Sequence, residues 1–253
     1  MNIAILTGAS AGLGQSFFRS LTARYPDLDA IWLIARRVER LQQMGEGSPI
    51  PVVALGMDLT DSAAYEMLTA RLDAEQPTVK ILINNAGLGQ LDNVADSDWA
   101  TQSRMVDLNC RALTAVTTLV LPYMTKGSFV VNVASIASFA PNARMTVYSS
   151  TKAYVLSFSR GLREELRQRG GGINSLAVCP GPMRTEFLEV ADITDRSPMF
   201  KMLPYCDPDK VADRAVVRAA RGRAVYTPRL FFKFYRLLAK LVPRCLIMKL
   251  CKT

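Results

Sequence analysis

Histidine is absent from all 253 residues of the chain. Without an imidazole the chain cannot build a Ser-His-Asp hydrolase, a Cys-His protease or the commonest protein metal sites, so we expect no metal ion. The five cysteines are odd in number and form no Cys-x-x-Cys pair. We expect them to be reduced core or surface thiols of a cytoplasmic enzyme.

Acidic residues are absent from the end of the chain. From Arg214 onward there are 11 lysines and arginines and no aspartate or glutamate, which leaves 20 basic against 22 acidic residues before that point. The overall charge of +9 therefore belongs to the last 40 residues. A nucleic-acid enzyme would more often spread its basic residues around a cleft, so we expect no nucleic-acid partner. A cationic tail points instead to anionic lipid, to a protein partner or to solubility alone.

Long hydrophobic runs are also missing. No segment reaches the roughly 20 uncharged apolar residues that span a bilayer. The first ten residues lead directly into a strand and lack the charged and apolar regions of a secretory signal. These absences favour a cytoplasmic location, with peripheral membrane contact left open for the basic tail.

Short apolar runs alternate with longer helical patterns along the chain. The expected strands are 3–6, 30–34, 52–55, 81–83, 129–133, 173–178 and 224–226, and the expected helices are 13–24, 63–74, 99–124 and 147–169. The runs lack polar alternation, as is typical of strands buried on both faces of a parallel sheet. The pattern predicts an α/β fold: a single-domain doubly wound (Rossmann) sheet of about seven parallel strands with helices on both faces, over 1–227.

A glycine-rich turn follows the first expected strand. Gly8 would permit the tight turn, Gly12 would let the main chain approach a pyrophosphate, and Gly14 would let the next helix pack close to the strand. The helix start offers free N–H groups to phosphates. A glycine pattern alone also fits an ordinary turn, but its place between a strand and a helix favours dinucleotide binding. The expected contacts are Gly8, Ser10, Ala11, Gly12, Leu13 and Gly14.

Two arginines end the second expected strand. An acidic residue there would bind the ribose 2′-hydroxyl of NAD, whereas Arg36 and Arg37 suit a 2′-phosphate. We therefore expect NADP(H) as the cofactor, with Arg36 as the main contact. The alternative is that both arginines belong to a solvated loop.

Six motifs in order resemble the short-chain dehydrogenase/reductase family over nearly the whole chain. They are the turn Thr7 to Gly14, the pair Asp58-Leu59, the run Asn84-Asn85-Ala86-Gly87, the isolated Asn109 and Ser135, the pair Tyr148 and Lys152, and the turn Pro180-Gly181 with Met183 and Thr185. The order and the positions at strand ends make coincidence an unattractive explanation.

The resemblance implies roles for several of these residues. Asp58, followed by Leu59, would hold the adenine amino group, and the run Asn85, Ala86 and Gly87 would line the adenosine ribose. Thr185 would hold the nicotinamide carboxamide, helped by the backbone near Met183. The resemblance also implies a homodimer or homotetramer.

Tyr148 and Lys152 lie four residues apart on an expected helix, so both occupy one face. A cation beside the phenol would lower the pKa of Tyr148 and make it an acid-base catalyst, and Lys152 would also bind the nicotinamide ribose. Ser135 follows the fifth strand and would stabilise negative charge on a substrate oxygen. For Asn109, a poor helix former within a long helix, the resemblance implies a local helix distortion and a water that links Lys152 to solvent. An ordinary surface pair is the alternative for Tyr148 and Lys152.

Two segments near the end have no assigned chemistry. A lid over about 186–206 contains Phe187, Leu188, Val190, Ile193, Met199, Phe200, Met202 and Leu203, and it fits either a bulky apolar ligand or helices packed on the body. The extension 228–253 predicts a basic amphipathic helix over 229–243, with Arg229, Lys233, Arg236 and Lys240 in one stripe. It would lie on an anionic membrane, cover the pocket or form a subunit contact.

These features predict an NADP(H)-dependent oxidoreductase that interconverts a ketone and a secondary alcohol, on a hydrophobic substrate such as a steroid, bile acid or lipid. The alternative is a catalytically silent NADP(H) sensor or scaffold of the same fold, which fold alone does not exclude.

Overall fold

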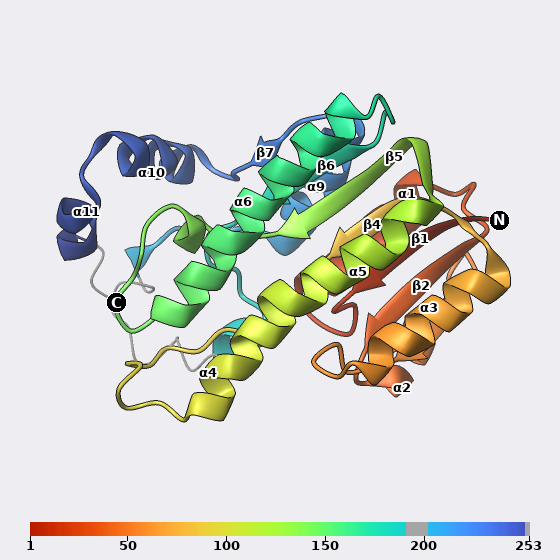
Figure 1. The fold of residues 1–253 in the computed structure, drawn as a ribbon, viewed down its shortest axis with the longest axis horizontal. Coiled ribbons are helices and arrows are strands. Elements are labelled where there is room, and N and C mark those ends of the chain that lie inside the picture. Colours follow the sequence, from red (N-terminus) through yellow and green to blue (C-terminus); the bar gives the residue numbers. More distant parts are fainter. Residues whose placement is uncertain (191–201, 251–253) are drawn as a thin grey trace.

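The computed structural model describes residues 1–190 and 202–250 (Figure 1). The strands are β1 (Asn2–Thr7), β2 (Ala30–Ala35), β3 (Val52–Gly56), β4 (Thr78–Asn84), β5 (Met124–Val133), β6 (Asn174–Val178) and β7 (Val225–Tyr226). The helices of the first half are α1 (Leu13–Arg24), α2 (Val38–Gly45), α3 (Ala63–Glu75), α4 (Trp99–Val106) and α5 (Leu113–Val120). Those of the second half are α6 (Thr146–Gln168), α7 (Glu186–Val190), α9 (Pro208–Ala220), α10 (Leu230–Leu241) and α11 (Arg244–Leu250).

The seven strands form one parallel sheet in the order β3-β2-β1-β4-β5-β6-β7. This confirms the doubly wound sheet expected from the sequence. The direction of winding reverses between β1 and β4, and a crevice forms at the carboxyl ends of such strands. The glycine-rich turn after β1 and the Asn85-Ala86-Gly87 run after β4 both lie at this switch point.

Helices cover both faces of the sheet, because alternate strand residues point to opposite sides. Ala4 and Leu6 pack with α1, α2 and α9 in one apolar core, while Ile3 and Ile5 pack with α3 and α5 in the other. Figure 1 shows α3, α5 and α6 side by side in front of the sheet. The apolar runs are therefore buried on both faces, as their lack of alternation predicted.

The expected helix 99–124 is present as four consecutive parts, and the local distortion that the resemblance implied at Asn109 is confirmed. The structure divides it into α4, a π-helix over Asp107–Ala112, α5 and a 3-10 turn over Leu121–Tyr123. The π-helix contains Asn109, whose side chain bonds the backbone of Leu88 instead of facing solvent. Met124 already belongs to β5, which begins five residues before the expected start.

The end of the chain follows the predicted helices closely. Asp207 caps α9 by accepting from the backbone N–H groups of Asp209 and Lys210, as the Asp-Pro start predicted. The tail helix α10 is two residues shorter at its end than the expected 229–243.

Of the residues that the structure describes, no helix is both long and apolar enough to cross a membrane. The lid residues Ile193, Met199 and Phe200 lie outside the described residues, and the division at residue 227 stays a prediction.

Candidate active site

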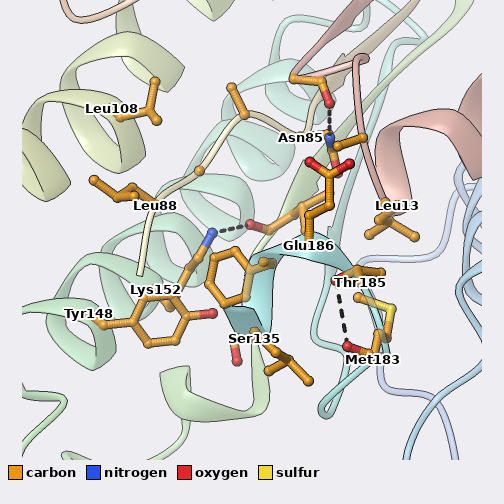
Figure 2. A pocket seen from close by; sticks show the side chains of 18 of the residues that line it. Leu13, Asn85, Leu88, Leu108, Ser135, Tyr148, Lys152, Met183, Thr185 and Glu186 are labelled. Carbon is orange, nitrogen blue, oxygen red and sulfur yellow. Dashed lines mark hydrogen bonds between the residues drawn. The ribbon is translucent and has the colours of Figure 1, made fainter. Parts of the chain in front are cut away.

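A pocket of about 600 Å³ opens at the carboxyl ends of the strands. Every residue named above for catalysis or cofactor binding lines it, with two exceptions. Gly14 lies behind the glycine-rich turn and Asn109 lies one layer behind Lys152. Figure 2 shows residues from distant parts of the chain, including Asn85, Ser135, Tyr148 and Thr185, directed into this single space.

The glycine-rich turn is packed too tightly for any side chain at two positions. A Cβ on Gly8, which has a φ of +64°, would lie 2.7 Å from the Cα of Ala86. A Cβ on Gly14 would lie 2.2 Å from the carbonyl oxygen of Gly8. The Thr7 hydroxyl accepts from the N–H groups of Asn85 and Ala86 at 3.1 Å. The two loops at the switch point therefore hold one another, and the start of α1 faces the pocket.

Arginines gather where β2 ends. Arg37 donates to the Glu186 carboxylate at 3.0 and 3.1 Å and to the Ser10 hydroxyl at 3.3 Å. Arg40, one turn along α2, donates to the same carboxylate at 2.7 Å. Hydrogen bonds from Arg40 and Arg37 lower the pKa of Glu186. Arg36, the expected main contact, is exposed, and its charge acts on Asp58. This corner of the pocket is cationic and is shared with the first residue of α7.

Asp58 lies on the same side of the pocket. Burial of its carboxyl opposes ionisation, but two hydrogen bonds from Thr60 and the charges of Arg104 and Arg36 outweigh burial and lower its pKa. Arg104 bridges to Asp58 at 3.0 Å. The carboxylate is thus ionised and fixed in place, and it can accept a hydrogen bond from a ligand amino group.

Tyr148 and Ser135 face each other on the deeper side of the pocket (Figure 2). Burial raises the pKa of Tyr148 to about 12, and the hydrogen bond with Ser135 lowers it only in part. The sequence led us to expect a Tyr148 pKa below the ordinary value. That expectation is wrong, because burial destabilises the phenolate by more than the neighbouring groups stabilise it. Tyr148 therefore carries its proton at neutral pH, the form that a proton donor needs.

Lys152 lies beside the Tyr148 ring, with its Nζ 5.8 Å from the ring centroid. Its ammonium donates to the carbonyl of Val133, the last residue of β5, at 2.9 Å. Burial lowers the pKa of Lys152 to about 8. An amine with that pKa gains and loses protons near neutrality, so Lys152 can exchange protons as well as supply charge.

Asn109 is 1% exposed and connects three elements. Its Oδ1 accepts from the Leu88 N–H at 2.8 Å, and its Nδ2 donates to the Leu88 carbonyl at 2.8 Å and to Thr151 Oγ1 at 3.0 Å. A Cβ on Gly87 would lie 3.2 Å from both Asn109 Oδ1 and Lys152 Nζ. Asn109 thus fixes the loop after β4 against α6, next to Lys152, without lining the pocket itself.

Apolar side chains surround the Tyr148 ring. Phe187 of α7 packs on it at a centroid distance of 5.8 Å and covers Gly89, where a Cβ would lie 2.6 Å from the Phe187 ring. Leu188 and Met145 belong to the same cluster. Asn142 also lines the pocket, and its buried Oδ1 has no hydrogen-bond partner among the described residues.

The sequence reasoning missed Arg40, Glu186, Arg104 and Asn142. Arg40 follows Arg37 by three residues, the spacing of one helical face, and α2 was not expected to be a helix. Glu186 stands 146 residues from Arg40, and no local pattern indicated that contact. No signal in the sequence distinguishes Asn142 from an ordinary loop residue.

A family model described as short chain dehydrogenase matches residues 2–195. The chain belongs to the short-chain dehydrogenase family. It is 33% identical over 195 residues to an NADP-dependent 3-hydroxy acid dehydrogenase of Escherichia coli O6:H1, covering 74% of this chain and 75% of that protein. The family confirms the resemblance drawn from the six motifs and makes the chain an oxidoreductase.

Two solved structures share the fold over almost the full length. A short-chain dehydrogenase from Sphingobium yanoikuyae in complex with NADPH is 30% identical, with a TM-score of 0.79 and 96% of each chain covered. A bulky-bulky ketone specific alcohol dehydrogenase from Comamonas testosteroni is 27% identical, with a TM-score of 0.73 and 96% of each chain covered.

The residues present fit a dinucleotide with a 2′-phosphate. Gly8, Ser10, Ala11, Gly12 and Leu13 line the pocket at the start of α1, whose free N–H groups suit a pyrophosphate. The end of β2 carries no acidic residue for a free ribose hydroxyl and instead presents Arg36 and Arg37, with Arg40 behind.

Proposed function

We propose that this protein is an NADP(H)-dependent oxidoreductase that interconverts a ketone and a secondary alcohol. The observation that carries the proposal is that Ser135, Tyr148 and Lys152 line the same pocket as the glycine-rich turn and Arg37. A proton donor, an oxyanion donor and a cofactor cradle in one space are the components that carbonyl reduction requires.

The nicotinamide supplies the hydride when the cofactor is bound. The residues of the chain handle the oxygen: Ser135 holds it by a hydrogen bond, and Tyr148 gives it the phenolic proton. Lys152, with its pKa near 8, returns a proton toward Tyr148 and stabilises the phenolate that forms. Asn109 acts as a positioning residue, because it holds the loop after β4 against α6 beside Lys152.

The same proposal assigns cofactor contacts. Ser10 to Leu13 and Gly14 would place the start of α1 against the pyrophosphate, and Asp58 with Leu59 would border the adenine. Arg36, Arg37 and Arg40 would surround the 2′-phosphate. The NADPH complex of the Sphingobium yanoikuyae neighbour and the NADP dependence of the Escherichia coli relative support this preference.

The proposed substrate is a hydrophobic ketone or alcohol. Phe187, Leu188 and Met145 give the space around Tyr148 an apolar lining. Among the described residues, no arginine or lysine other than Lys152 lines that end, so a carboxylate of a small hydroxy acid would lack a cationic partner. The bulky ketones named for the Comamonas testosteroni neighbour agree with an apolar pocket, whereas the 3-hydroxy acid named for the Escherichia coli relative does not.

We further propose that the protein works in the cytoplasm as a homodimer or homotetramer, with peripheral membrane contact through the 228–253 extension. The family resemblance supports self-association. The cluster of basic residues at the end of the chain supports membrane contact.

The test is cofactor oxidation with a panel of ketones that range from small hydroxy-acid precursors to steroid-like compounds, run with NADPH and NADH side by side. The proposal expects turnover with NADPH that rises with the apolar size of the ketone. Clear preference for NADH would contradict the assignment of the arginines. Tight NADPH binding without turnover of any ketone would instead favour the silent sensor or scaffold.

A further inference from the structure

One side of α10 presents large apolar side chains to solvent. The row consists of Leu230, Phe234, Leu237 and Leu241. These positions recur at four, three and four residues, which keeps them on one side of a helix. Their exposed fractions run from 53% to 80%. Large exposed apolar patches on a protein usually mark an interaction site, which indicates that this row contacts another molecule.

The opposite side of α10 holds the helix on the body. Phe232 is fully buried, and a Cβ on Gly181 would lie 2.1 Å from its ring. Tyr235 packs on Phe139 at a centroid distance of 6.1 Å. Since the body side is already packed, the exposed row is not the surface that joins α10 to its own domain. Phe232 packs against Gly181 and does not itself line the pocket, so the expectation that the extension covers the pocket stays a prediction.

A basic stripe borders the apolar row. Arg229, Lys233, Arg236 and Lys240 precede the four apolar residues by one position each. Lys233 and Lys240 are exposed, whereas Arg236 is half-buried and its guanidinium lies 5.8 Å from the centroid of the Phe139 ring on the body. The last 40 residues contain no acidic side chain. A second copy of α10 laid on this surface would bring like charges together, while an anionic surface would be complementary.

Exposed apolar side chains also occur on α11. Leu246 and Met248 are exposed, whereas Ile247 between them is buried. In both helices, therefore, one apolar side chain is buried, Phe232 or Ile247, while other large apolar side chains are exposed to solvent. Figure 1 places both helices at the end of the molecule toward which the arrow of β5 points, the end that carries the pocket.

We propose that the outer side of α10, with Leu246 and Met248 of α11, lies in the interface of an anionic phospholipid bilayer. The apolar row enters the headgroup and acyl boundary, and the exposed Lys233 and Lys240 contact lipid phosphates. Because Phe232 touches Gly181 of the pocket turn, docking holds the pocket at the membrane surface. The consequence that the pocket receives ketones dissolved in the bilayer rests on the proposed function.

The test is flotation of the full chain with vesicles of phosphatidylcholine alone and with about 30% phosphatidylglycerol at low salt. We expect binding to the anionic vesicles, at least tenfold weaker in Phe234→Ser/Leu237→Ser. Lys233→Gln/Lys240→Gln should lose about tenfold on anionic vesicles only, since each cation near such a surface contributes a several-fold factor. Matched controls with exposed residues elsewhere should bind like the wild type: Met67→Ser/Val94→Ser for apolar area and Arg160→Gln/Arg169→Gln for charge.

Wild-type protein that stays unbound on anionic vesicles would overturn the proposal, as would unchanged binding of Phe234→Ser/Leu237→Ser. If light scattering showed that this variant splits a dimer while vesicle binding is unaltered, the surface would be a contact between copies and the proposal would be wrong. Flotation does not depend on cofactor oxidation. Failure of the membrane proposal is therefore distinguishable from failure of the proposed function.

Discussion

At the scale of single residues, Lys152 lowers the stability of the folded protein. Its buried ammonium donates to a neutral carbonyl, that of Val133, and burial lowers its pKa to about 8 from 10.5. Between those two values the unfolded chain binds a proton that the folded chain does not. The stability of the protein should therefore rise with pH through that window, and the full penalty applies below about pH 8.

The variant Lys152→Met removes this titration while keeping similar volume. Relative to the variant, the wild type should gain stability as the pH rises from 7 to 10, by up to about 3 kcal/mol, because one pKa unit corresponds to about 1.4 kcal/mol. Urea unfolding of both proteins at several pH values measures the gap. The exposed-site variant Lys126→Met should show no such pH-dependent gap, and a constant gap for Lys152→Met would contradict the buried, shifted amine.

Glu186 competes for the arginines that are proposed to hold the 2′-phosphate. Its carboxylate accepts from both Arg37 and Arg40, so Glu186→Gln should free their charge and tighten NADPH binding about fivefold, within the range of exposed ion pairs. NADH lacks the phosphate and should bind with nearly unchanged affinity. Fluorescence titration of both cofactors gives the comparison.

Glu39→Gln is the matched control for Glu186→Gln, since Glu39 is exposed on α2 and the substitution removes the same charge. Equal tightening for NADH and NADPH, or an equal effect of Glu39→Gln, would mean that the contact itself does not compete with the phosphate.

At the scale of elements, α10 is joined to the pocket turn by one close contact. A methyl group at Gly181 cannot fit, because the Phe232 ring stands 2.1 Å from that position. Gly181→Ala should destabilise the protein by about 1–3 kcal/mol through overpacking, and Phe232→Ala by about 3–5 kcal/mol through a cavity. The double variant should lose clearly less stability than the sum of the two single losses, because the cavity left by Phe232→Ala accommodates the methyl group of Gly181→Ala. Additive losses in urea unfolding would show that the two residues are not in contact.

Sequence patterns predicted helices and strands well where the apolar periodicity was strong. They failed where long-range hydrogen bonds or a weak apolar pattern determined the local structure. α6 and the strands other than β5 were predicted within a few residues of their bounds, because strands such as β1, β2 and β4 are buried on both faces. The π-helix at Asn109 was indicated by the family resemblance and not by periodicity, because the Asn109 side chain bonds the backbone of Leu88, 21 residues away. α2 was missed, because its eight residues bury only Leu41 and leave little apolar pattern.

At the scale of the whole molecule, the sheet order explains why separated motifs meet. The loops after β1 and β4 are neighbours at the switch point, and Ser135 follows β5 beside them. The order of the motifs was therefore enough to predict that these loops border one pocket. The contact of Glu186 with Arg37 and the partnerless Asn142 oxygen depend on how α7 and a loop pack, which no motif encodes.

The positive charge and the exposed apolar side chains both concentrate near the end of the chain. The residues before Arg214 are nearly neutral, and the basic residues end the chain on helices whose outer sides are apolar. Figure 1 places α10 and α11 at one end of the molecule, and α10 carries both the exposed Lys233 and Lys240 and the exposed apolar row.

The most direct test of the central claim is the turnover of Tyr148→Phe with NADPH and a ketone that the wild type reduces. The ring and its packing against Phe187 remain, while the proton donor is lost, so NADPH affinity by fluorescence should stay within about twofold and turnover should fall by about 10²–10⁴. Turnover equal to that of the wild type, at unchanged NADPH affinity, would contradict the account.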